Sequence, residues 1–252
     1  MLEDFRESRV ARLYVMDYGL FQVHSNGRII GITGSLIETD DGKRVLVDTG
    51  FPRKYLEDRE GASREDKLDE FGRILELGPE NMPAGQLGKL GLTPADIDLQ
   101  ILTHSHIDHV GGIADFTHVP MVVSKEERAL DRPLYWHGRH PYRWPEAQEY
   151  IEVEDDIELF PGLTLLQTPG HTPGQMSLLL DLPETGAVIL TSDTISRPDE
   201  LDGHFEDYWR PAMAEESARR LMALAADRDA FVIFGHCPAQ WPTLRKVPEY
   251  YA

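Results

Sequence analysis

Seven consecutive residues, Thr103 to His109, hold the densest group of side chains in this chain that could do chemistry. Their order, Thr-His-Ser-His-Ile-Asp-His, places His104, His106, Asp108 and His109 within six positions. Imidazole and carboxylate groups at such spacing suit Zn²⁺ or another divalent first-row metal. The alternative is a polar loop whose histidines cap a helix or face water, and four ligand-type groups so close together argue against it. The motif therefore predicts a metal site.

The elements on either side of the motif are those needed to position it. The short apolar run 99–102 predicts a strand, and Val110-Gly111-Gly112 predicts a tight turn into a helix. The first two histidines of the motif are two residues apart, so they share one face of an extended segment. The aspartate and the last histidine follow where the chain must turn. They can therefore serve a second ion beside the first.

Three distant residues of ligand type stand where strands are expected to end. His171 lies in the Gly/Pro-rich turn 168–174, and Asp193 and His236 each follow an apolar run. Loops at the ends of strands are where rigid scaffolds carry binding and catalytic residues. We therefore expect all three to join the motif in one site.

This combination of residues resembles the metallo-β-lactamase superfamily and, within it, the quorum-quenching N-acyl-homoserine lactonases. The resemblance rests on the motif at 103–109, on His171, Asp193 and His236 in that order, and on Val47-Asp48-Thr49-Gly50. It covers nearly the whole chain. Hydrophobic periodicity alone predicts only a mixture of α and β structure. The resemblance implies an α/β fold, the αβ/βα four-layer sandwich.

The resemblance also implies two divalent metal ions. Seven residues would ligate them: His104, His106 and His171 for one ion, Asp108, His109 and His236 for the other, and Asp193 as a bridge. Zn²⁺ is the first expectation, although Mn, Co and Fe accept the same ligands. In the family, the aspartate equivalent to Asp48 supports the metal loop through hydrogen bonds. An aspartate that merely starts a turn is the alternative.

The activity implied is the opening of a lactone ring, most of all that of an N-acyl-homoserine lactone, by a metal-bridging hydroxide. Metal binding lowers the pKa of water from ~15.7 toward ~7, so hydroxide is available at neutral pH. Asp108 would be the catalytic residue that handles the proton. No serine or cysteine nucleophile is needed. The single cysteine, Cys237, is expected to be a small buried side chain rather than a ligand.

One position departs from the family pattern and bears on the substrate. The best-known lactonases carry a tyrosine three residues after the bridging aspartate, whereas this chain has Ser196. Loss of one oxyanion donor can cost about 10²–10³ in rate. Either Tyr208 or a tyrosine of segment 131–150 replaces the phenol, or the substrate is a different ester or lactone. We also expect substrate contacts from Ile107, which predicts an aliphatic wall, and from Trp136.

The chain is expected to form a single domain with two lid-like insertions. Residues 51–90 are highly charged and interrupted by prolines, although 67–75 has helix-like apolar spacing. Residues 131–150 are rich in aromatic side chains and could cover the substrate or pack on the body or a second subunit. A homodimer is therefore an open expectation. His137 and His140 lack a strand end or a carboxylate neighbour, so neither is predicted to be a ligand.

Composition excludes several classes of function. The 252 residues carry a formal charge of −19, which disfavours nucleic acid because phosphates are usually engaged by Lys and Arg. No apolar run approaches the ~18 residues of a membrane span, and the charged N-terminus predicts no signal peptide. A single cysteine excludes an internal disulfide and agrees with a reducing compartment. We therefore expect a cytoplasmic protein with a small-molecule substrate.

Other reactions remain open on the same scaffold. One alternative is the hydrolysis of another carboxylic ester, lactone, thioester or lactam. A glyoxalase-type thioesterase normally has an added C-terminal helical region, and a secreted β-lactamase would be expected to have a signal peptide. A diiron oxygen-reducing or sulfur-oxidising protein is an alternative of another class. The complete ligand set and the lack of a flavin domain favour hydrolysis, and a purely structural role is least expected.

Overall fold

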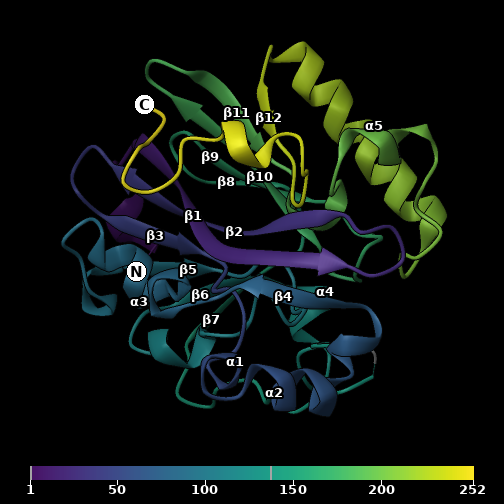
Figure 1. Ribbon diagram of the computed structural model, residues 1–252. Helices are drawn as coiled ribbons and strands as arrows, with labels where there is room; N and C mark the ends of the chain where they lie inside the picture. The colour runs from purple at the N-terminus through teal and green to yellow at the C-terminus, as the bar shows by residue number, and fades with distance from the viewer. Residues whose placement is uncertain (1, 137) are drawn as a thin grey trace.

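Two β-sheets lie face to face in the computed structural model, which describes residues 2–136 and 138–252. Figure 1 shows helices on the outer side of each sheet, with α5 above and α1 and α2 below. Both sheets are mixed, since each combines antiparallel and parallel pairs. The expected αβ/βα sandwich is confirmed. His137, which we did not predict as a ligand, lies outside the described residues.

The larger sheet has the strand order β4-β1-β2-β3-β5-β6-β7, and the smaller has the order β12-β11-β10-β9-β8. The strands of the larger sheet are β1 (Val10–Val23), β2 (Ile29–Thr39), β3 (Arg44–Val47), β4 (Gly72–Glu76), β5 (Leu99–Ile101), β6 (Met121–Ser124) and β7 (Tyr150–Val153). Those of the smaller sheet are β8 (Ile157–Phe160), β9 (Leu163–Gln167), β10 (Met176–Leu182), β11 (Gly186–Leu190) and β12 (Phe231–Ile233). The helices are α1 (Lys54–Glu57), α2 (Arg59–Asp66), α3 (Pro83–Gly88), α4 (Lys125–Arg128) and α5 (Pro211–Asp227).

Strand β1 shows how the layers are held together. Its side chains alternate between two buried faces, as the period of two requires. Leu13 and Val15 pack in the core between the sheets, whereas Tyr14 and Met16 belong to the core beneath the helices of the first half. Residues 13–16 of the strand are therefore covered on both sides, which explains why they form a continuous apolar run.

Helix α5 covers the outer face of the smaller sheet through one apolar stripe. Its buried apolar residues Ala214, Ala218, Leu221 and Ala225 are spaced by four, three and four positions, which puts them on one side of the helix. They form a third core with strand residues such as Ile189. The Ala- and Leu-rich sequence of this segment favours a helix.

The prediction of a helix over 67–75 is wrong. The segment is a short 3-10 turn, Leu68–Glu70, followed by β4, which pairs antiparallel with β1. Backbone pairing with a distant strand, such as that of Ile74 with Phe21, overrides the local apolar spacing. Because β4 belongs to the large sheet, part of segment 51–90 is scaffold.

Segment 131–150 also has buried anchors. Tyr135 is fully buried and Trp144 is buried, and both pack in the core beneath the first helices. The backbone of Tyr135 pairs with the metal-site motif beside His106. The lid-like role of this segment and of 51–90 stays a prediction.

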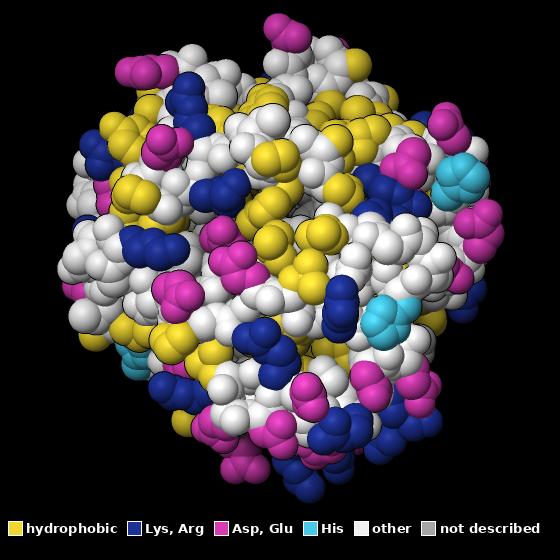
Figure 2. All heavy atoms as spheres, in the orientation of Figure 1, with side chains coloured by type: hydrophobic (Ala, Val, Ile, Leu, Met, Phe, Trp, Pro, Cys, Tyr) yellow, Lys and Arg dark blue, Asp and Glu magenta, His cyan; other side chains and the backbone are white. Residues whose placement is uncertain are grey.

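The surface is mixed in character. Figure 2 shows hydrophobic side chains gathered near the middle of one face, with acidic and basic side chains around them. The longest helix among the described residues, α5, has 17 residues and is interrupted by charge. No helix in the described part of the chain is long and apolar enough to cross a membrane.

Candidate metal centre

The ligand-type residues meet at the ends of strands from both sheets. The motif 103–109 follows β5, and His171 follows β9. Asp193 and His236 follow the parallel neighbours β11 and β12, whose ends lie side by side. All seven predicted residues are brought together, in two groups whose ligand atoms lie within 4.8 Å of one another. The first cluster is His104, His106, His171 and Asp193; the second cluster is Asp108, His109 and His236.

Distances in the first cluster suit the corners of a coordination shell. His106 Nδ1 is 2.9 Å from His171 Nε2. Asp193 Oδ2 is 3.3 Å from His171 Nε2 and 3.7 Å from His104 Nε2. Ligands ~2.0–2.1 Å from a tetrahedral zinc ion are separated by roughly 3.3 Å. The spacing therefore fits atoms that share one ion.

The second cluster has similar spacing and shares Asp193 with the first. Asp108 Oδ2 lies 3.8 Å from His109 Nε2 and 3.5 Å from His236 Nε2. The other oxygen of Asp193, Oδ1, lies 3.5 Å from His109 Nε2 and 3.2 Å from His236 Nε2. The two oxygens of Asp193 therefore face different clusters, which is the arrangement of a bridging carboxylate.

Several of these atoms are buried without a hydrogen-bond partner among the described residues. They include His104 Nε2, His109 Nε2 and Asp193 Oδ1. A buried polar atom left unsatisfied costs about 1–3 kcal/mol, and more for a charged group. Nitrogen and oxygen donors with this spacing fit a divalent ion in each cluster, and such an ion would satisfy these atoms.

The buried carboxylates and histidines of the two clusters shift one another's pKa values. Burial would raise the pKa of Asp193, but His236, His109 and His104 hold it well below its usual value. Burial opposes the charging of His236, yet Asp193 and Asp108 raise its pKa to about 9. The pKa of His109 is raised well above its ordinary value because nearby carboxylates outweigh burial. His104 differs, since burial and the neighbouring histidines lower its pKa.

Asp48 holds the motif in place from the end of β3. Thr103 donates its backbone N–H to Asp48 Oδ1 at 2.9 Å and its hydroxyl to Oδ2 at 2.7 Å. His109 Nδ1 donates to Asp48 Oδ2 at 2.8 Å, because a carboxylate only accepts. This bond leaves Nε2 of the imidazole free to face the second cluster. The prediction that Asp48 supports the metal loop is confirmed.

Two further histidines have their tautomers set in the same way. His236 Nδ1 donates to the carbonyl of Gly31 at 2.9 Å. His104 Nδ1 lies 3.2 Å from Thr103 Oγ1, whose own proton goes to Asp48. When either imidazole is neutral, Nε2 is therefore the lone-pair atom, and it points at the cluster.

Close backbone packing fixes the end of the motif, and this leads to a prediction. Gly111 donates to the carbonyl of Gly50 at 2.8 Å, and an added Cβ would lie 2.1 Å from the carbonyl carbon of Phe51. We expect Gly111→Ala to lower the free energy of unfolding by about 1–3 kcal/mol through overpacking. Denaturant unfolding measures this loss. Gly88→Ala is the control because a Cβ there meets nothing within 4 Å, and equal stability of the two variants would contradict the prediction.

Tyr208 lies where the sequence lacks a tyrosine. Its hydroxyl is 3.3 Å from Ser196 Oγ, and its ring packs edge-on against His171 with centroids 4.7 Å apart. The phenol donates to Glu200 Oε2 at 3.1 Å, and the same oxygen accepts the N–H of Ser196 at 2.6 Å. Burial and the Glu200 carboxylate raise the pKa of Tyr208, so it stays a protonated donor.

Of the other two residues predicted to contact the substrate, one is buried in the core and one is half-buried. Ile107 is 1% exposed and packs in the core, so no open wall is formed by its side chain. Trp136 is half-buried and meets Phe71 edge-on at 5.2 Å between ring centroids. His140 belongs to neither cluster. Cys237 is buried and also outside both clusters, so the expectation of a small buried side chain is confirmed.

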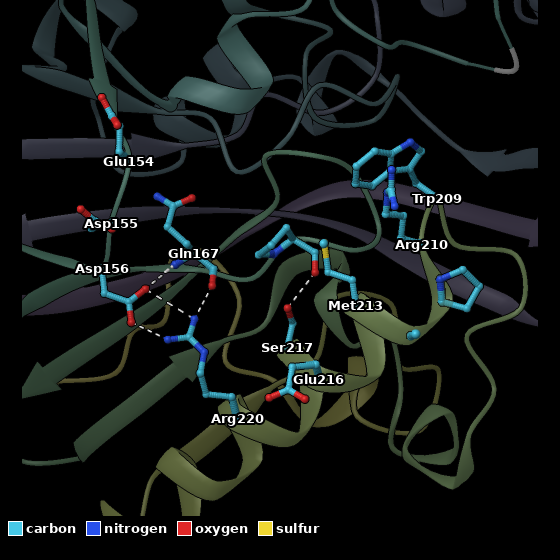
Figure 3. A pocket seen from close by; sticks show the side chains of 13 residues that line it. Glu154, Asp155, Asp156, Gln167, Trp209, Arg210, Met213, Glu216, Ser217 and Arg220 are labelled. Atoms are coloured by element: carbon cyan, nitrogen blue, oxygen red, sulfur yellow. Dashed lines mark hydrogen bonds and ion pairs between the residues drawn. The ribbon is translucent and has the colours of Figure 1, made fainter.

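Helix α5 supports the His171 loop beside a separate groove. This groove of about 1290 Å³ is lined by residues of 154–169 and 209–220, and none of the seven ligand-type residues lines it. Ser217 donates its hydroxyl to the Pro169 carbonyl at 2.7 Å, and Figure 3 shows this bond from the labelled Ser217 as a dashed line. Arg210 donates its N–H to the carbonyl of Gly170 at 2.9 Å. The start of the helix therefore fixes the backbone just before His171.

Sequence reasoning missed two buried carboxylates near the site, Glu127 and Glu200. Glu200 is 3% exposed and Glu127 fully buried. The pattern Ser124-x-x-Glu127 is a helix-start signal and says nothing about contacts further away. Only the fold brings these groups to the site.

Comparison with known proteins agrees with this geometry. Residues 31–236 match the model of the metallo-beta-lactamase superfamily. The N-acyl homoserine lactonase AiiA of Bacillus thuringiensis subsp. kurstaki is 33% identical over 223 residues, 85% of this chain and 84% of that protein. A Bacillus thuringiensis AiiA variant with N-decanoyl-L-homoserine bound at its active site superposes with a TM-score of 0.86 at 28% identity, over 96% of this chain and 100% of the other. An N-acyl homoserine lactone hydrolase with N-hexanoyl-L-homoserine at its catalytic metal center gives 0.85 at 28% identity over the same shares. The chain therefore belongs to the metallo-β-lactamase superfamily and, within it, to the family of the N-acyl homoserine lactonases.

Proposed function

We propose that this protein is a dinuclear metal-dependent hydrolase that opens the ring of N-acyl-homoserine lactones. The observation that carries the proposal is the position of Asp193, whose two oxygens face different groups of histidines. The relatives named above support the substrate class, since two of them have acyl-homoserines bound. We propose zinc as the metal because imidazole and carboxylate donors at this spacing suit it.

The residues proposed to hold the two ions are those of the two clusters. His104, His106 and His171 would hold one ion, Asp108, His109 and His236 the other, and Asp193 both. Bound ions would supply Lewis acidity toward the lactone carbonyl and activation of water at neutral pH. The protein orients the imidazoles through Asp48, Gly31 and Thr103 and keeps most of them out of bulk water.

Asp108 is proposed to move the proton. Its side chain is 14% exposed to solvent, whereas that of Asp193 is 8% exposed. One oxygen faces His109 and His236, so the carboxylate lies at the edge of the site. It would accept a proton from the attacking water and return it to the leaving alkoxide.

Two surfaces beside the clusters are proposed to hold the substrate. Tyr208, packed on His171 and next to Ser196, would donate its phenol to the developing oxyanion. The half-exposed pair Phe71 and Trp136 would contact the acyl chain, because Trp136 follows the residue that pairs with the motif. Ile107 would then support the motif from the core.

The proposed function is tested by proton release from lactones. Metal-loaded protein is given acyl-homoserine lactones of short and long chain, simple γ- and δ-lactones, a thioester and a β-lactam, each with a chelated control. We expect fast, chelator-sensitive opening of the homoserine lactones. If only another ester is turned over, the proposed metal chemistry is kept and the proposed substrate is wrong. Turnover that chelation leaves unchanged would overturn the proposal.

The role of Tyr208 gives a prediction of its own. Tyr208→Phe removes one oxyanion donor, so we expect kcat to fall by about 10²–10³ with a smaller change in KM. Steady-state kinetics on a homoserine lactone measure both constants. Tyr150→Phe is the matched control, because that phenol donates only to the Pro145 carbonyl at 3.0 Å. A larger loss in the control would assign the donor to segment 131–150 instead.

Three further expectations complete the proposal. Metal analysis of the purified protein tests zinc against manganese, cobalt and iron. Fractionation and light scattering test the cytoplasmic location and the homodimer, which stay predictions.

A further inference from the structure

Glu127 is a fully buried carboxylate outside the seven proposed ligands. It lies in the single turn of α4, directly after β6. Among the described residues it makes no ion pair with Lys, Arg or His. Burial of an unpaired charge is expensive unless hydrogen bonds replace water. The charge of Glu127 therefore has to be stabilised by hydrogen-bond donors around it.

Four donors from two separate loops converge on this carboxylate. Ser105 donates both its backbone N–H, at 2.8 Å, and its hydroxyl to Oε1. Thr172 donates its hydroxyl to Oε2 at 2.9 Å, and Gly174 donates its N–H to the same oxygen at 3.1 Å. Oε1 thus accepts hydrogen bonds from the motif 103–109, and Oε2 accepts them from the loop that carries His171.

These loops are the ones that carry the histidines of the first cluster. Ser105 stands between His104 and His106, and Thr172 directly follows His171. Glu127 therefore bonds to a residue adjacent to every histidine of that cluster. The residues that donate to Glu127 are not adjacent in sequence to any residue of the second cluster.

The contact is tightly packed. An added Cβ on Gly174 would lie 2.0 Å from Ser124 Oγ and 2.4 Å from the backbone nitrogen of Glu127. The backbone of the His171 loop therefore rests directly on the start of α4. Little space remains for the carboxylate to shift without moving one loop relative to the other.

We propose that Glu127 is a positioning residue that sets the spacing of the two loops and so the geometry of the first metal site. This inference rests on the proposed function, because it assumes that the first cluster holds an ion. Glu127 touches neither the ion nor the substrate. It acts by holding the imidazoles at the separation that one ion requires.

Glu127→Gln tests the inference because it keeps the shape and replaces one acceptor by a donor. The amide NH₂ would face two donors of one loop and would push that loop away. Loss of an outer partner of metal ligands typically costs 10–100-fold in metal affinity. We expect Zn²⁺ binding at the first site to weaken by about that factor, measured by competition with a chromogenic chelator.

Each site is measured alone by removing a ligand of the other. In the His236→Ala background only the first site is complete, and in the His171→Ala background only the second site keeps all its own histidines. We expect Glu127→Gln to weaken Zn²⁺ binding in the first background and to leave the second about equal. Equal weakening in both would overturn a positioning role and assign Glu127 to general stability.

Two further variants keep the test decisive. Gln86→Leu is the control, since Gln86 is also a fully buried polar side chain that joins two other segments, accepting from the Asp17 N–H at 3.0 Å and donating to the Glu80 carbonyl at 2.7 Å. We expect it to lower the free energy of unfolding without changing the ratio of the two site affinities. If Glu127→Gln does not fold, Thr172→Val removes a single donor and should weaken the first site in the same direction. No change of that site in Thr172→Val would then overturn the inference.

The wild type separates this inference from the proposed function. If the wild-type protein binds two Zn²⁺ ions and opens the lactone, a null result with Glu127→Gln concerns only Glu127. If the wild type binds no Zn²⁺, the proposed function itself fails before any variant is compared.

Discussion

Asp193→Asn is expected to release both metal ions and abolish turnover. The carboxylate of Asp193 lies between four imidazoles, with one oxygen toward each cluster. An asparagine keeps one acceptor but turns an NH₂ group toward the other cluster and removes the negative charge. Breaking a buried charge interaction costs about 3–5 kcal/mol, which corresponds to about 10²–10⁴ in metal affinity.

The metal content of dialysed Asp193→Asn, measured by atomic absorption, checks this expectation. Asp199→Asn is the control, because Asp199 is exposed and pairs only with Arg197 nearby. We expect the control to keep the metal content of the wild type. Two ions retained in Asp193→Asn, with normal turnover, would contradict the bridging role.

Asp108→Asn is expected to lower kcat by about 10²–10⁴. The carboxylate is the most exposed of the acidic groups in the two clusters, so it can reach both a substrate and solvent. An amide cannot take up a proton at neutral pH, and it is a weaker ligand than a carboxylate. The second cluster keeps His109, His236 and the shared Asp193, so metal occupancy should fall less than the rate.

The rate per bound ion distinguishes proton transfer from loss of metal. Asp108→Asn is assayed with excess Zn²⁺, and kcat is divided by the measured occupancy. Asp115→Asn is the control, because Asp115 lies just beyond the same motif and is exposed. Full activity of Asp108→Asn at full occupancy would refute the proposed mechanism.

The two substitutions are expected to fail in different ways. Excess Zn²⁺ should restore little activity to Asp193→Asn, because each cluster then has an NH₂ group or a weaker acceptor in place of a charge. In Asp108→Asn, excess metal should restore occupancy but not the rate. This contrast follows from burial, since the side chain of Asp193 is buried between the two clusters and that of Asp108 is more exposed, at their edge.

Local spacing was enough to predict the ligand-type residues and several elements. The motif at 103–109 and the Gly/Pro turn around His171 are dense enough to stand out, and a short apolar run precedes the motif. Helix α5 has its buried residues three and four positions apart, and β1 alternates between two cores. These patterns depend on neighbours within a few residues, so the sequence contains them.

The tertiary structure decided what depends on distant segments. Segment 67–75 has helix-like spacing, but β4 forms there because an edge of the large sheet, at β1, offers hydrogen bonds. Pairing of that kind involves residues about 50 positions apart and leaves no local period. The same holds for the positions of Tyr208 beside Ser196 and of Glu127 between two ligand loops.

The sequence by itself therefore determined the types of the site's residues and the strand that precedes the motif. The fold decided their mutual orientation: which oxygen of Asp193 faces which cluster, and which nitrogen of each imidazole is held by Asp48 or Gly31. Residue types are encoded one position at a time. Orientation depends on hydrogen bonds and close packing between loops from both sheets, which exist only once the two sheets have come together.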